Sequence, residues 1–169
     1  MKRALLLLLL MTTTGCNLVR GPKRDHECRS TLRQIMALEF GFQSQQLRYT
    51  THPHELGFAP SPGNRYLYLF DKVGDVTRRD EKPSPLPKDS VGYGPDTPKR
   101  DITVEDLLPK FPPEARALLG IEGTCPDCQL VVGCIANLDD DPDVDVWTIS
   151  TKDRPGANRG TPLKFVSDL

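Results

Sequence analysis

Five aspartates gather between residues 139 and 145, flanked by two apolar segments. Four of them alternate along the chain as the first ligands of a calcium loop do: Asp139, Asp141, Asp143 and Asp145. Calcium takes roughly six to eight oxygen ligands, which a cluster of carboxylates can supply. Val144 replaces the glycine of an EF-hand loop and Ser150 replaces its bidentate glutamate, so the stretch is not an EF-hand. Calcium binding and a solvated acidic turn are the two hypotheses that remain.

The pair Cys125-x-x-Cys128 is the second group of residues that could carry chemistry. A c-type haem site requires histidine directly after the second cysteine, and Gln129 stands there, so we expect no haem. Thiol–disulfide exchange requires such a pair at a helix N-terminus, where the thiol pKa is lowered. The residues that follow, 129–132, are typical of a strand instead, which favours a structural disulfide. A periplasmic redox protein or electron carrier is the alternative.

The N-terminus has the pattern of a secretion signal. Lys2 and Arg3 precede an apolar run at positions 4–11, which as a helix would span about 12 Å, far less than the roughly 30 Å of a bilayer core. The following Gly15-Cys16 resembles a bacterial lipobox, although Thr13 stands where such signals usually carry leucine. We therefore predict a signal peptide at 1–15 and lipidation of Cys16, with an ordinary signal peptide as the alternative.

Export changes what the remaining cysteines are expected to do. If Cys16 is lipidated, four cysteines enter an oxidising compartment, where two disulfides are the default. Cys28 lies on the apolar face of a predicted helix, and by alternation Cys134 lies on the strand face that would meet it. We favour the pairs Cys28–Cys134 and Cys125–Cys128. Pairing of Cys28 with one of the other two remains open.

Two predicted elements position these residues. Between positions 24 and 48, apolar residues recur at spacings of three and four, which predicts an amphipathic helix with an unexplained glutamate, Glu39, on its apolar face. Two β-prone runs, 130–136 and 144–149, flank the acidic turn and predict a hairpin. A third run at 65–70 predicts another strand. The fold class that follows is α+β, a helix packed on a small antiparallel sheet.

The middle of the chain is rich in proline. Eight prolines fall within residues 81–113, and each removes a backbone donor, so we predict a long surface loop there with one helical turn at 104–108; a mobile linker is the alternative. A short helix is expected at 112–119, since proline opens that segment and Gly120 closes it. A last edge strand is expected at 163–166. The domain organisation is a signal peptide, a tether at 16–23 and one globular domain at 24–169.

Several stretches together resemble the globular part of type IV pilins, pseudopilins and pilin-like proteins, particularly those of myxobacteria. They read Glu-Cys-Arg-Ser-Thr-Leu-Arg from residue 27, Glu-Leu-Gly-Phe-Ala-Pro from residue 55, and Asn-Leu-Asp-Asp-Asp-Pro-Asp-Val-Asp-Val-Trp-Thr-Ile from residue 137. The resemblance implies a head domain with a helix on an antiparallel sheet. A pilin also begins with a long apolar helix that forms the filament core. The short run at 4–11 departs from that pattern, so we do not expect the usual mode of filament packing.

The charge and the motifs of the sequence argue against two classes of function, nucleic-acid binding and catalysis. The formal net charge of −1 gives no field that would attract nucleic acid, and no nucleophile–base order or paired-carboxylate pocket stands out, so we predict no enzyme. We predict a lipid-anchored structural or interaction protein of the bacterial envelope, at the outer membrane and alongside type IV pilus or secretion proteins. Besides the redox protein, the other alternative is a minor pilin whose true start lies upstream of Met1.

Overall fold

The computed structural model describes residues 26–79, 87–96, 102–138 and 142–166. The predicted signal peptide, tether and lipidated Cys16 lie outside these ranges, as do Asp139 and Asp141. Helix α1 (His26–Gln46) comes first and is followed by seven strands: β1 (Leu67–Leu69), β2 (Asp75–Arg79), β3 (Ser90–Asp96), β4 (Gly120–Glu122), β5 (Gln129–Ala136), β6 (Asp145–Ser150) and β7 (Leu163–Val166). Three short helices stand between β3 and β4: α2 (Val104–Leu107), the 3-10 helix η1 (Leu108–Lys110) and α3 (Pro113–Ala117).

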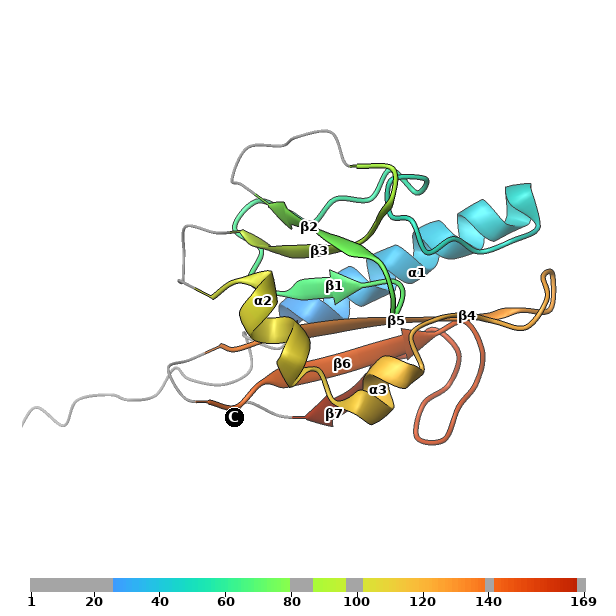
Figure 1. The fold of residues 1–169 in the computed structure, drawn as a ribbon. Helices are drawn as coiled ribbons and strands as arrows, with labels where there is room; N and C mark the ends of the chain where they lie inside the picture. Colours follow the sequence, from blue (N-terminus) through green and yellow to red (C-terminus); the bar gives the residue numbers. More distant parts are fainter. Residues whose placement is uncertain (1–25, 80–86, 97–101, 139–141, 167–169) are drawn as a thin grey trace, which may run out of the picture.

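The strands form a single sheet in the order β2-β3-β1-β5-β6-β7, with β4 also paired to β5. All pairings are antiparallel except that of β2 with β3, which is parallel. Helix α1 lies across one face of the sheet, and α2, η1 and α3 lie on the other (Figure 1). The architecture is thus an α+β fold with a helix on a mostly antiparallel sheet, as the sequence predicts.

The two faces of the sheet have separate cores because side chains alternate along each strand. Toward α1, Cys28, Leu32 and Ile35 pack with residues such as Tyr68 and Val132. Toward the short helices, a second cluster packs against the opposite side of the same strands; its members include Leu69, Leu107, Phe111, Leu119, Val131 and Ile135. Strands β1 and β5 are buried on both faces, which explains their continuous apolar runs.

The prediction of a surface loop for residues 81–113 is wrong in part. Residues 90–96 form β3, a buried strand between β2 and β1. Proline density misleads here because the prolines lie beside the strand or, as with Pro95, near its end. Gly92 lets the strand approach β1 closely, since a Cβ there would lie 2.4 Å from the Tyr68 carbonyl oxygen. The helical turn expected at 104–108 is confirmed as α2.

Two further predictions of local structure are confirmed. The edge strand at 163–166 is confirmed as β7, and the helix expected at 112–119 is confirmed as the shorter α3. Strand β2, which follows Gly74, pairs in parallel with the later strand β3 and was not foreseen. Strand β4 has only three residues and was not foreseen. Within the described ranges, no helix has the length and apolar character needed to cross a membrane.

Candidate functional site

Asp145 lies at the start of β6, where the acidic turn ends, and its side chain is fully buried. Its Oδ2 accepts hydrogen bonds from the Tyr66 hydroxyl at 2.7 Å and from Trp147 Nε1 at 2.8 Å. Its Oδ1 lies 3.3 Å from Lys164 Nζ on β7, which forms an ion pair. Burial and the bond to Asp145 together raise the pKa of Tyr66, so its hydroxyl stays a donor. Asp145 therefore joins β6, β7 and the segment leading into β1.

These contacts bear on the calcium hypothesis. Asp143 is exposed in the turn, whereas Asp145 faces the core on the α1 side and its oxygens already have protein partners. Among the residues that the structure describes, no group of three acidic, histidine or cysteine side chains could hold a metal. The remaining predicted ligands lie outside the described ranges, so calcium binding stays a prediction.

Two disulfides join the pairs that the sequence favours. Cys28 in the first turns of α1 is bonded to Cys134 in the middle of β5, and both are fully buried. This bond ties the helix to the sheet across a sequence separation of 106 residues. Cys125 and Cys128 form the second bond in the turn between β4 and β5. A strand follows this second pair, so it lacks the helix N-terminus that an exchange-active pair uses.

Cations lie over the aromatic rings along the side of α1 that faces β6 and β7. Arg29 and Lys164 approach the Trp147 ring at 5.4 and 5.2 Å from its centroid. Farther along the helix, Arg159 from the β6–β7 connection stacks over Phe40 at 4.3 Å. Cation–π contacts of this kind cover apolar rings while leaving the charge near water. They were not predicted, because they join residues far apart in the sequence.

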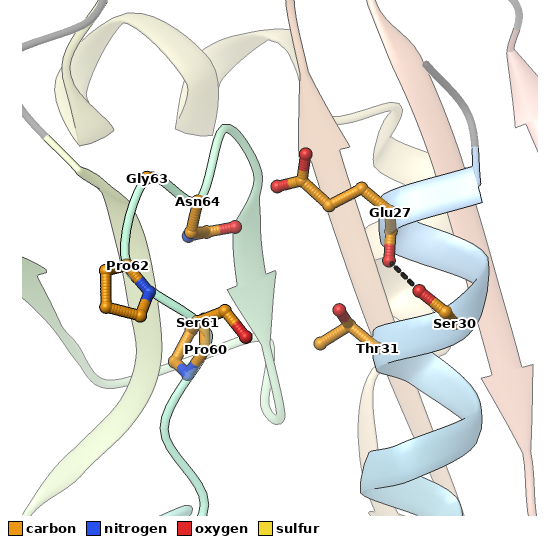
Figure 2. Close-up of a pocket in the computed structure, with 8 residues that line it drawn as sticks. All are labelled: Glu27, Ser30, Thr31, Pro60, Ser61, Pro62, Gly63 and Asn64. Atoms are coloured by element: carbon orange, nitrogen blue, oxygen red, sulfur yellow. Dashed lines mark hydrogen bonds between the residues drawn. The ribbon is translucent and has the colours of Figure 1, made fainter. Parts of the chain in front are cut away.

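A groove of about 290 Å³ lies between the first turn of α1 and the loop at residues 60–64 (Figure 2). Its lining is Glu27, Ser30, Thr31, Pro60, Ser61, Pro62, Gly63 and Asn64. The Glu27 carboxylate accepts bonds from the Arg65 amide at 2.8 Å and from Arg65 Nε at 2.7 Å. The Ser30 hydroxyl donates to the Glu27 carbonyl at 3.0 Å. The lining holds no histidine or cysteine, so it offers no nucleophile with a nitrogen base.

The arrangement of a long first helix, joined to the middle of a mostly antiparallel sheet, is type IV pilin-like. The chain is similar in sequence to the type IV major pilin protein PilA of Myxococcus xanthus (strain DK1622), at 29% identity over 143 residues. The match covers 75% of this chain, which spans 64% of the length of that relative. No protein-family model matches the chain. The relative is a pilin, which supports the prediction that this chain is not an enzyme.

Proposed function

We propose that the protein is an exported, type IV pilin-like structural protein of the bacterial envelope, held at the membrane by a lipid on Cys16. The observation that carries the proposal is the similarity to a major pilin over 75% of the chain, on a pilin-like fold. The Gly15-Cys16 pair after a short apolar run supports the anchor.

The head would act through its surfaces, as expected of a structural protein. The cation-bearing side of α1 and the acidic turn offer opposite charges to neighbouring proteins of a pilus or secretion assembly. The formal net charge of −1 makes protein partners a better fit than nucleic acid.

Cell fractionation tests this proposal. Cells that express the native chain are sheared, and the detached filaments, the soluble periplasm and the detergent-extracted membranes are probed for the protein. We expect it in the membrane fraction, and we expect Cys16→Ser to shift the folded, disulfide-bonded head to the soluble fraction. Recovery in the detached filaments would contradict the anchored role and support the minor-pilin alternative. A soluble wild-type protein would contradict the anchor.

A further inference from the structure

Glu39 is a fully buried carboxyl group on the face of α1 that packs on the sheet. Its Oε2 accepts one hydrogen bond, from the Thr50 amide at 3.2 Å. Its Oε1 is buried without a hydrogen-bond partner among the described residues. Asp145 is equally buried, but its Oδ2 accepts two hydrogen bonds, and its Oδ1, which likewise accepts none, forms the ion pair with Lys164. A buried carboxylate that accepts only one hydrogen bond has a high free energy, so the surroundings of Glu39 favour the protonated acid.

The partner of Glu39 belongs to a loop that turns back along the helix. Residues 47–58, which we name the clasp loop, leave the end of α1 through Leu47 at a positive φ of 56° and run back beside the helix (Figure 1). Tyr49 and Thr50 are buried near its start. At its far end, the Phe58 carbonyl accepts a bond from the Tyr93 hydroxyl at 2.9 Å. The Glu39–Thr50 contact holds the near half of the loop together with the buried Tyr49 ring, and Tyr93 holds the far end.

The charged groups around Glu39 come from the clasp loop. Arg48 and Glu55 pair with each other at 3.1 Å near the surface, and His52 donates its backbone amide to the Thr50 hydroxyl at 3.0 Å. The core that packs on α1 from the sheet is built of apolar and aromatic side chains and the Cys134 sulfur. Burial raises the pKa of Glu39 to about 8, Glu55 adds to that rise, and the Thr50 amide and Arg48 oppose it.

We propose that Glu39 and the Thr50 amide form a proton-dependent clasp, which holds the near half of the clasp loop on α1 while the carboxyl is protonated and releases it on ionisation. The carboxyl O–H bond breaks and its proton goes to solvent, and the hydrogen bond from the Thr50 amide opens with the loop; no other covalent bond changes. Release exposes Thr50 and the apolar ring of Tyr49 at this end of the head. The Cys28–Cys134 disulfide keeps α1 on the sheet throughout, so the change is confined to the loop.

The size of the effect follows from the two protonation equilibria. Opening the loop admits solvent to Glu39 and lowers its pKa from about 8 toward the ordinary value of 4.5. Full solvation sets the upper limit of the effect. The opening constant therefore rises by up to about tenfold per pH unit between these values and levels off above the higher one. From pH 6 to pH 8 the opening constant rises by up to about fifty-fold.

Hydrogen–deuterium exchange of the exported full chain tests the clasp, read on peptides from residues 47–58 and corrected for the intrinsic pH dependence of exchange. In the wild type, protection of this segment should fall by up to about fifty-fold from pH 6 to pH 8, while peptides from β5 stay protected. Glu39→Gln keeps an acceptor for the Thr50 amide but cannot ionise, so its protection should be independent of pH.

Glu55→Gln is the matched control, because it removes a nearby carboxylate and leaves Glu39 in place. This variant should retain the pH-dependent loss of protection. Equal loss of protection in the wild type and in Glu39→Gln would overturn the clasp, as would a wild-type segment whose corrected protection does not change with pH. Retention of β5 protection in every variant confirms that each one is folded.

Discussion

At the scale of single residues, two carboxyl groups are equally buried and differently used. Asp145 has two hydrogen-bond donors and the ammonium group of Lys164, whereas Glu39 has one backbone amide. A buried charge is tolerated when it is paired and bonded, and otherwise the group is neutralised. We therefore assign Asp145 a structural role as the shared partner of Tyr66, Trp147 and Lys164, and we treat Glu39 as a group that titrates.

Substitution of Asp145 tests the first part of this view. Asp145→Ala leaves the Tyr66 hydroxyl, the Trp147 indole nitrogen and Lys164 without their shared partner, so the free energy of unfolding should fall by roughly 3–5 kcal/mol. Urea unfolding followed by Trp147 fluorescence measures this. Asp89→Ala, which changes an exposed aspartate, should cost less than about 0.5 kcal/mol. Equal losses in the two variants would show that the Asp145 contacts contribute little.

The pH dependence of global stability tests the second part. The folded pKa of Glu39, about 8, lies above its ordinary value of 4.5, so its stabilising contribution is complete below pH 4.5 and is lost as the pH rises through 8. Glu39→Gln should match the wild type near pH 4.5 and become more stable than it as the pH rises through 8, up to the limit at which the clasp loop opens and solvates Glu39. Urea unfolding of both proteins from pH 4.5 to pH 9 gives the difference. A difference that does not vary with pH would contradict the raised pKa.

At the scale of elements, the sequence predicts what has a clear periodicity. Helix α1 and the β5–β6 hairpin follow from apolar spacing, and the pairing of Cys28 with Cys134 follows from placing both on facing surfaces. Strand β3 could not be foreseen, because glycines and a proline hide its pattern and its pairing with β2 is a long-range contact. The same limit applies to Asp145, whose partners Tyr66 and Lys164 come from distant segments. The alternating spacing of the aspartates predicts a metal ligand at Asp145 instead.

Packing of the short helices on the sheet can be tested at Gly133. A Cβ there would lie 2.8 Å from Phe111 Cζ and 3.0 Å from Leu119 Cδ2. Gly133→Ala should therefore lower the free energy of unfolding by roughly 1–3 kcal/mol through overpacking. Phe111→Leu removes the contacting ring atom, so the double variant should recover part of the loss relative to Phe111→Leu alone. Strict additivity in this thermodynamic cycle would mean that the two residues do not touch.

The two disulfides should contribute unequally to the free energy of unfolding. In the chain-entropy model a cross-link over a separation of 106 residues stabilises by about 5 kcal/mol, and one over a separation of 3 residues by about 2 kcal/mol. We expect Cys28→Ala with Cys134→Ala to destabilise the head more than Cys125→Ala with Cys128→Ala does. Thermal unfolding of both double variants makes the comparison. The reverse order would place the main covalent constraint in the β4–β5 turn.

At the scale of the whole molecule, the chain adds three short helices to a pilin-like fold of one long helix on a sheet. The helices α2, η1 and α3 cover the face of the sheet opposite α1, so both sheet faces are buried. The described residues therefore form one sheet with a core on each face, in a fold that is type IV pilin-like.

The most direct test is the intact mass of the native, membrane-extracted protein, measured with and without reduction before alkylation. We predict a chain that starts at Cys16 and carries acyl mass, with four further cysteines alkylated only after reduction. An unmodified N-terminus would contradict the anchored protein. Alkylation of Cys125 and Cys128 without reduction would contradict the disulfide-bonded head and would favour a redox role for that pair.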